Sequence, residues 1–440
     1  ARALLVAGYG LLAGLIIVPL MMRGLDAFGL SIHFRTSAIA VVLTLLILVI
    51  LQFGLRGRTD GFLPSAGPTG SLPPAAKLCM LLLLAMLALR VVTLGAELLG
   101  RPLFPWDATM HWATKARVWF EHGSIEPFVE NDRWLMMGGE GVYTDHHPGY
   151  PITIPLLQVW MTSAIGRWDE SLMNLPWLLC LIGLGLAFYG QLRLAGVQSL
   201  VAICFTYMLL SMPLLNTHVA LAGYADLFLG AIYCAALMAF YHWTVTRQPW
   251  QGILALSFAV ACILIKNEGF YWFLSFIPGL VAVVLPPRRA IVVFALMALG
   301  VIAALLLIPE DFAVAGHSLE RLNIYYRPGS EAAIAASIWV HNNWHLLGYL
   351  LVALLLLAIL RLRLYEYRGI AVTLAAALCL FLVLFTLTGY ARGALRFTAV
   401  GRISLHLMPA LMFLVALLGS ELMRGGSRRS NPVPPAPVAS

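Results

Sequence analysis

The chain has 440 residues, of which 61% are hydrophobic and 11% are charged, and its mean hydropathy is +0.88. Soluble domains carry about 25% charged residues, so this composition excludes a soluble domain, a disordered chain, a coiled coil, a collagen and a disulfide scaffold for most of the length, and it indicates that lipid is the main solvent. The net charge of +8 comes from basic residues that lie mainly in short segments between apolar runs, which is typical of membrane topology signals and does not indicate a nucleic-acid partner.

The apolar runs predict the transmembrane helices. Crossing a bilayer takes about 20 mostly apolar residues. Runs of about this length occur at 3–22, 37–55, 77–99, 171–191, 196–214, 219–242, 250–266, 269–286, 290–308, 345–361, 369–388 and 403–423. We therefore expect an all-α polytopic membrane protein with about 12 transmembrane helices.

Two apolar stretches and the cysteines need separate interpretation. The first run lacks a small-residue cleavage site and is followed by further spans, so we expect a retained helix and not a signal peptide. The stretch 151–165 is short and contains Pro151 and Pro155, so we predict an interfacial or re-entrant segment. All six cysteines lie inside apolar runs without CxxC or metal-ligand spacing, which favours core or lipid-facing residues.

The connections between the runs predict the orientation and the domain organisation. The short connections rich in Arg fall on one side, so we place both termini in the cytoplasm. This gives two N-terminal helices and a cytoplasmic linker at 1–76, a transmembrane core at 77–423 with outer loops at 100–170 and 309–344, and a disordered cytoplasmic tail at 424–440. The hydropathy shows no internal repeat, which weakens a transporter interpretation because many transporters carry repeats.

The first outer loop opens with a candidate reactive helix after Pro105. A spacing of four places Asp107, His111 and Lys115 on one helix face. An acid, an imidazole and an amine in a row suit proton transfer and phosphate binding. The alternatives are a helix cap at Asp107 and a surface helix with a salt-bridged face.

A second polar stretch of this loop contains Asp145, His146, His147 and Tyr150. Two His beside an Asp could hold a metal, but adjacent His point in different directions and no HxxxH or HxH spacing is present. We therefore predict no metal site and favour a polar turn that docks the loop onto the membrane. Contact with a donor or an acceptor is the alternative.

Charged residues also interrupt the apolar spans near their outer ends. They are Asp226, Lys266, Glu268, Arg392, Arg396 and Arg402, with His406 in the last span. Charges at such depths are costly and usually face a cavity or pair with one another. In the twelve-span topology they all open to the same side as Asp107, so we predict a polar cavity at the outer membrane interface. For each residue alone, a structural ion pair is the alternative.

Several of these stretches resemble one known family. They are Trp106-Asp107-Ala108 with Trp112 and Lys115-Ala116-Arg117, Tyr150-Pro151 with Pro155, Gly223-Tyr224-Ala225-Asp226, Lys266-Asn267-Glu268-Gly269, and Arg402 with His406 and Pro409. In their order over about 100–410, they resemble the GT-C superfamily of membrane glycosyltransferases, and most of all its bacterial members grouped with the dolichyl-phosphate-mannose and aminoarabinose transferases. The two spans before residue 77 are additional to the simplest pattern of that family.

The resemblance implies an inverting enzyme of the bacterial inner membrane whose active site faces the periplasm. It implies a polyprenyl-phosphate sugar donor, a glycan, lipid or protein acceptor, and a carboxylate in the first outer loop as the catalytic base, which corresponds to Asp107. The family often has a second carboxylate beside this one, whereas the sequence here is Trp-Asp-Ala. This difference leaves open whether Glu121, Asp145 or another acid assists. It makes a divalent metal the less favoured alternative, and no other cofactor is predicted.

The residues themselves suggest how such a reaction would run. A sugar hydroxyl needs a base to take its proton, for which Asp107 is the candidate. The leaving lipid phosphate needs fixed cations, for which Lys266, Arg392, Arg396 and Arg402 are candidates. Two alternatives share the cationic cavity: a transporter or flippase for a lipid-linked glycan, and an oligosaccharide ligase or polymerase.

Overall fold

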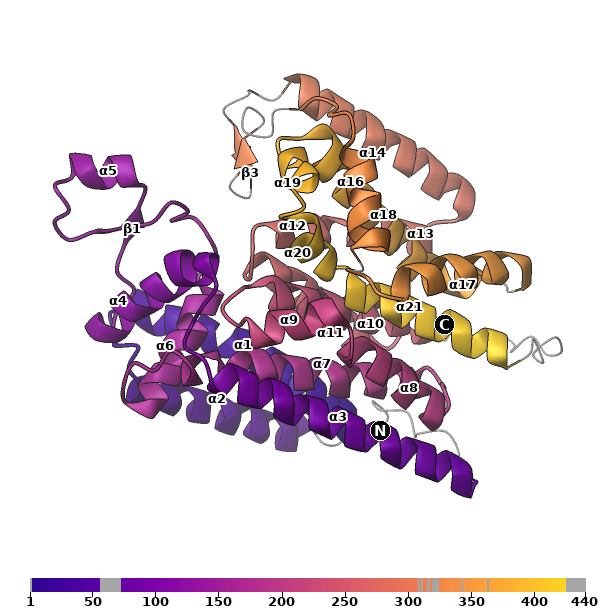
Figure 1. The fold of residues 1–440 in the computed structure, drawn as a ribbon, viewed down its shortest axis with the longest axis horizontal. Coiled ribbons are helices and arrows are strands. Elements are labelled where there is room, and N and C mark those ends of the chain that lie inside the picture. Colours follow the sequence, from indigo (N-terminus) through magenta and orange to yellow (C-terminus); the bar gives the residue numbers. More distant parts are fainter. Residues whose placement is uncertain are drawn as a thin grey trace.

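The computed structural model describes residues 2–55, 73–307, 309, 312–314, 317–318, 324–341, 343–361 and 364–424. Most of the predicted linker, and all of the predicted tail beyond residue 424, lie outside the described residues, as does part of the second outer loop. The described chain is almost entirely helical, which confirms the all-α class (Figure 1). Two short strand pairs occur, β1 (Phe128–Val129) with β2 (Tyr143–Thr144) and β3 (Ala313–Val314) with β4 (His317–Ser318).

The helices follow the predicted apolar runs closely. In the first half they are α1 (Arg2–Ala27), α2 (Phe34–Leu55), α3 (Pro74–Leu99), a π-helical turn η2 (Ala108–Ala113), α4 (Thr114–His122), α5 (Asn131–Met136), α6 (Thr153–Ile165), η3 (Leu172–Asn174), α7 (Leu175–Leu194), α8 (Ser199–Leu210) and α9 (Pro213–Ala220). In the second half they are α10 (Asp226–Thr246), α11 (Pro249–Ile263), α12 (Glu268–Leu274), α13 (Phe276–Val284), α14 (Pro287–Leu307), α16 (Ser330–Ala335), η4 (Ala336–Val340), α17 (Leu347–Arg361), η5 (Leu364–Tyr367), α18 (Arg368–Leu387), α19 (Ala391–Leu395), α20 (Val400–Leu405) and α21 (Met408–Met423).

Seven described helices are long and apolar enough to cross a membrane. They include α1, α2, α3, α7, α10, α14 and α18. The predicted run 196–214 contains α8 and only the first two residues of α9. These two helices are bent by 57° and could together make an eighth span. The runs near 250–266, 269–286, 345–361 and 403–423 form helices shorter than 18 residues. Several membrane-length helices are therefore present, while the count of twelve spans stays a prediction.

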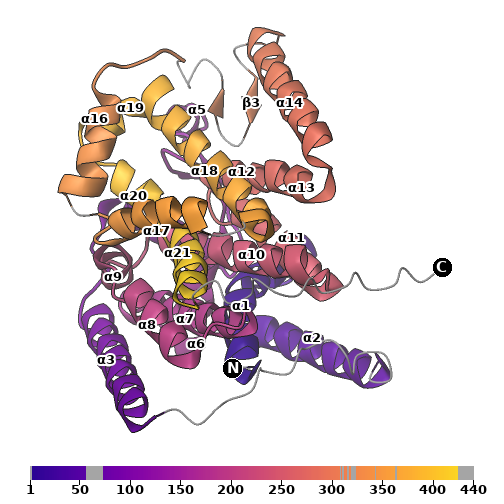
Figure 2. The same cartoon turned by 90° about the vertical axis from the view of Figure 1, so that its right-hand side faces the viewer.

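Helix α10 forms the centre of the bundle. Of its most apolar window, 83% is buried, compared with 6% for α2 and for α14. It packs against α7, α11 and α21, and α7 packs in turn against α1, as both views show (Figures 1 and 2). A helix that is apolar all round and fully enclosed forms a protein core, whereas the exposed apolar faces of α2 and α14 are typical of helices in contact with lipid.

Small residues allow α1 and α7 to approach closely. A Cβ atom on Gly8 would collide with the backbone of Ala187, and one on Gly190 would collide with Leu5. Glycine at such positions lets two membrane helices pack backbone against backbone. This contact joins the N-terminal helices to the core, although the sequence placed them in separate units.

The first outer loop lies at one end of the bundle. Figure 1 shows α4, α5 and β1 at this end, while α21 runs away from it. Helix α6, predicted as an interfacial or re-entrant segment, is 13 residues long and largely buried against α1 and α4. The loop therefore rests on a helix that is too short to span the membrane.

Candidate functional site

An ion pair between the first outer loop and the C-terminal part of the chain marks the site. Nη1 of Arg402 donates to Oδ2 of Asp107 at 2.5 Å. Both side chains are 31% exposed. Asp107 precedes η2 and makes no capping hydrogen bond, so the helix-cap interpretation does not describe its contacts.

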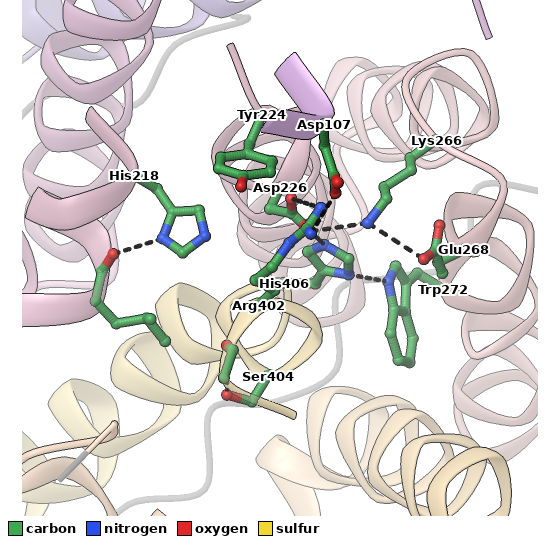
Figure 3. Close-up of polar contacts among 12 residues, drawn as sticks. Asp107, His218, Tyr224, Asp226, Lys266, Glu268, Trp272, Arg402, Ser404 and His406 are labelled. Carbon is green, nitrogen blue, oxygen red and sulfur yellow. Dashed lines mark hydrogen bonds and ion pairs between the residues drawn. The ribbon is translucent and has the colours of Figure 1, made fainter. Parts of the chain in front are cut away.

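The same guanidinium reaches a fully buried acid behind it. Nη2 of Arg402 lies 3.3 Å from Oδ2 of Asp226, whose side chain is 0% exposed. Nζ of Lys266 donates to the other oxygen at 2.8 Å, and Nε2 of His406 lies 2.9 Å from it. We call Asp107, Asp226, Lys266, Arg402 and His406 the charged network (Figure 3).

The hydrogen bonds of His406 assign its protons. Indole Nε1 of Trp272 donates to Nδ1 of His406 at 3.0 Å, and an indole N–H can only donate. Nδ1 is therefore an acceptor, and Nε2 carries the proton that is donated to Asp226. A second proton on this ring would break the bond from Trp272, so the network favours a neutral His406.

Helix ends position these side chains. The sequence placed Asp226 about two turns into a span, but it is the first residue of α10 because the chain leaves the helical path at Gly223, with φ of 107°. A Cβ atom at Gly223 would also collide with Ala108. This glycine therefore lets the turn before α10 touch the outer loop beside Asp107, as only a residue without a side chain allows.

Lys266 lies in the turn between α11 and α12, and Glu268 begins α12. Their side chains form a second ion pair, with 3.2 Å between Nζ and Oε1. Lys266 is thus held between two acids and is only 5% exposed. In this position Lys266 neutralises the buried charge of Asp226 and Glu268. Its charge also adds to the positive potential that a ligand would meet.

A second cluster lies within the outer loop. Asp145 accepts a hydrogen bond from Nδ1 of His111 at 2.7 Å, and its other oxygen lies 2.6 Å from Nζ of Lys115. Lys115 also donates to the backbone carbonyl of His147. We call Asp145, His111 and Lys115 the loop triad. It fixes the stretch 143–150 onto η2 and α4, so these residues dock the loop onto its own helix.

Of the three residues predicted on one face, His111 and Lys115 share Asp145 as a partner, while Asp107 pairs with Arg402 instead. Between Asp107 and Lys115 the chain forms the π-helical turn η2, with hydrogen bonds from residue i to i+5. Such turns are frequent at functional sites.

Tyr150 lies between the loop triad and the charged network. Its ring stacks on Trp112, with 5.2 Å between centroids, and lies edge-on to His111 at 5.9 Å. Burial raises the pKa of Tyr150 to about 12, and the negative charge of Glu268 contributes to the shift. Trp106, 61% exposed, packs its ring against His111. We call Trp106, Trp112, His147 and Tyr150, which lie along the two clusters, the aromatic border.

The structure does not bring every predicted residue into these clusters. Arg392, Arg396 and His146 are exposed, and no ion pair joins them to any residue of the described chain. Two contributors were not singled out from the sequence. Tyr224 lies beneath the guanidinium of Arg402 at 4.2 Å, and Trp272 orients His406. Tyr224 lies in the stretch Gly223-Tyr224-Ala225-Asp226, so its closeness to Asp226 in the sequence could have marked it as a site residue. Trp272 lies in an apolar helix, and nothing in the sequence distinguishes it from other apolar residues there.

No group of three or more metal-ligating side chains occurs among the described residues. Each acid of the charged network instead has a cationic partner. The arrangement can therefore hold an anion at Arg402 and a proton at Asp107.

The loop triad predicts a dependence of stability on pH. Burial opposes the ionisation of Asp145, but the hydrogen bonds from His111 and Lys115 outweigh it and lower its pKa to about 2. Because the folded pKa lies below the unfolded value of about 3.9, the contribution, about 2 kcal/mol, is present above pH 4 and is lost as the pH falls to about 2. The difference in unfolding free energy between wild type and Asp145→Asn, measured by thermal unfolding, should be present at pH 5 and shrink below pH 4. A difference that persists unchanged at pH 2 would contradict this account.

No family model, curated protein or solved structure matches this chain.

Proposed function

We propose that this chain is a membrane glycosyltransferase. It would move a sugar, with inversion, from a polyprenyl-phosphate donor to a glycan, lipid or protein acceptor on the outer face of a bacterial inner membrane. The observation that supports this most is the Asp107–Arg402 pair. It presents a partly exposed carboxylate and a partly exposed guanidinium side by side, above the buried Asp226.

Arg402 is the best candidate for the donor phosphate. Nη1 is paired with Asp107 and Nη2 with Asp226, while its Nε atom is buried without a hydrogen-bond partner among the described residues. The buried Asp226 and the Tyr224 ring hold the guanidinium in place. An arriving phosphate would compete with Asp107 for Nη1, because both present oxygens to the same planar fork.

Release from Arg402 would make Asp107 available as a base. In the proposed step, the acceptor oxygen forms a bond to the anomeric carbon, and the bond from that carbon to the phosphate oxygen breaks. Asp107 takes the hydroxyl proton, and the polyprenyl phosphate leaves with the bonding electrons. Arg402, supported by Lys266, would stabilise the charge that develops on the phosphate.

The aromatic border suits a sugar acceptor. Trp106 is 61% exposed, and Tyr150 and His147 stack with 4.9 Å between ring centroids. Such faces pack against the apolar faces of sugar rings, and the neighbouring polar atoms can bond hydroxyl groups.

A transporter of lipid-linked glycans would use the same cations without making a bond. The test is transfer of a labelled sugar from a synthetic polyprenyl-phosphate donor by purified protein in nanodiscs, with product detected by mass spectrometry. New glycosidic product supports the enzyme. Movement of intact donor across vesicles containing the protein, with no product in nanodiscs under any acceptor, would support the transporter.

The proposal also requires the site to face outward. Cysteines introduced at exposed positions of 100–150, in a cysteine-free background, should react with a membrane-impermeant thiol reagent added to intact cells. Those placed in 57–76 should react only after the membrane is opened. The reverse labelling pattern would contradict an outer-face reaction.

A further inference from the structure

Arg327 lies in the second outer loop, just before α16. Its backbone N–H donates to the carbonyl of Thr386, and the N–H of Tyr325 donates to the carbonyl of Leu387. The segment is therefore fixed to the end of α18 by its backbone. Among the described residues, these backbone bonds fix the loop without a hydrogen bond from Nε or Nη2 of the Arg327 side chain.

The guanidinium of Arg327 is buried, and two of its nitrogens have no hydrogen-bond partner among the described residues. Arg327 is 6% exposed, and its Cζ atom lies 3.9 Å from the centroid of the Tyr325 ring, which covers one face. Nε and Nη2 are both buried and have no hydrogen-bond partner among the described residues, and no described acid forms an ion pair with Arg327. Burying a cation whose donors have no partner is costly, so the two unpaired nitrogens favour the binding of an anion here.

The two unpaired nitrogens, Nε and Nη2, lie on the same edge of the guanidinium group and can bind one anion together. The N–H of Nε and one N–H of Nη2 point in the same direction and form one edge of the guanidinium plane. This edge matches two oxygens of a phosphate or carboxylate.

The surroundings add positive charge. Helix α16 packs against α19, as Figure 2 shows, and α19 begins just before Arg392 and ends just before Arg396. Both of these arginines are exposed, and no ion pair joins them to the described residues. Glu331, the acid of α16, instead accepts a hydrogen bond from Tyr326. Three guanidinium groups thus occur in this region, and none of them is paired with an acid in the part of the chain that the structure describes.

The region adjoins the charged network. Tyr390 directly precedes α19. Helix α18 packs against both α19 and α12, and α12 begins at Glu268, so the start of α19 lies on a helix that also borders the charged network.

We propose that Arg327, with Arg392 and Arg396 at its entrance, is a second anion site that binds the phosphate group of an anionic lipid. Phosphatidylcholine also carries a phosphate, but its choline cation would meet the three arginines, so it should bind poorly. A phosphate fits because it offers two oxygens to the buried edge and further charge to the exposed arginines. A lipid fits because the site lies in a membrane protein at the end of a span, α18. The site does not depend on glycosyl transfer, since it would bind a lipid phosphate in a transporter as well.

The test measures thermal stability of the full-length protein in nanodiscs as the fraction of phosphatidylglycerol in phosphatidylcholine is increased. Wild type should be stabilised, because a ligand that binds only the folded state raises the unfolding temperature. Arg327→Met should weaken the apparent affinity by about 10–100-fold, since charge-assisted bidentate bonds are lost. In pure phosphatidylcholine this variant should unfold at the wild-type temperature or above it, because an unpaired buried charge has been removed.

Two further variants and a soluble probe complete the test. Arg327→Lys keeps the charge but loses the fork, so it should also bind more weakly. Arg133→Met removes an exposed arginine of α5 and should leave the phosphatidylglycerol response unchanged. Inorganic phosphate added to phosphatidylcholine nanodiscs should protect poorly; protection equal to that by phosphatidylglycerol would overturn the lipid source. An unchanged phosphatidylglycerol response in Arg327→Met, or an equal loss of stability in both lipids, would overturn the site.

Discussion

Asp107→Asn is expected to lower sugar transfer by roughly 10²–10⁴-fold, the usual effect of losing a general base. Asn has nearly the size of Asp but cannot take the acceptor proton. Folding should survive, because Arg402 keeps its contact with Asp226 and both side chains of the pair are 31% exposed, where water can replace the lost bond. The measurement is turnover of the labelled polyprenyl-phosphate donor, with donor binding and thermal unfolding measured on the same samples.

The control for this variant is Asp132→Asn, the same change at an exposed position of α5, which should transfer sugar at the wild-type rate. Loss of a helix cap cannot mimic the expected result, since Asp107 makes no capping bond and Asn is itself among the best caps. Turnover close to wild type in Asp107→Asn would remove it as the base. The remaining candidates would then be Asp145, Asp226 and Glu268.

Asp226→Asn is expected to destabilise the protein by roughly 3–5 kcal/mol, as breaking a buried ion pair does. Its side chain is fully buried and meets Lys266, His406 and Arg402. Without the carboxylate, Lys266 retains only Glu268 as an acid, and Arg402 retains only Asp107. Unfolding in detergent, followed by circular dichroism, measures the effect.

The physical reason can be tested with a second change. Adding Lys266→Gln to Asp226→Asn removes the stranded cation, so the double variant should lose less than the sum of the two single changes. Glu121→Gln is the matched control, because it breaks an exposed pair with Arg117 on α4 and should cost at most about 1 kcal/mol. Additive losses in the double variant would show that Asp226 and Lys266 do not depend on each other.

Part of the site followed from the sequence because membranes penalise isolated charges. Asp226, Lys266, Arg402 and His406 were expected to open to one side. The structure joins the other three to Asp226, and it joins Asp107 to them through Arg402. Their partners could not be assigned, because Arg402 and Asp107 are 295 positions apart and any of several cations could have met either acid. The choice depends on how α10, α12 and α20 pack.

Arg392 and Arg396 were predicted beside Arg402 as cations of the same cavity, but the structure leaves both of them exposed. Arg392 and Arg396 lie close to Arg402 in the sequence and carry the same charge, so nothing in their local pattern distinguishes the three residues. The chain turns between α19 and α20, which leaves the first two exposed and brings the third to Asp226. Arg327 was not singled out at all, because its isolation is a property of its neighbours in space.

The apolar composition by itself determined that the chain is helical and lies in a membrane, because hydrocarbon leaves each backbone polar group to be satisfied within its own helix. The lengths of the apolar runs and the polar residues between them also determined the approximate bounds of those helices. Pro213 marks the break between α8 and α9 in the sequence, and only the tertiary structure decided that the two helices are bent by 57° there. It alone decided that Asp107 pairs with Arg402 and not with the lysine on its own helix, because the two residues are 295 positions apart and meet through the packing of α20 against α10.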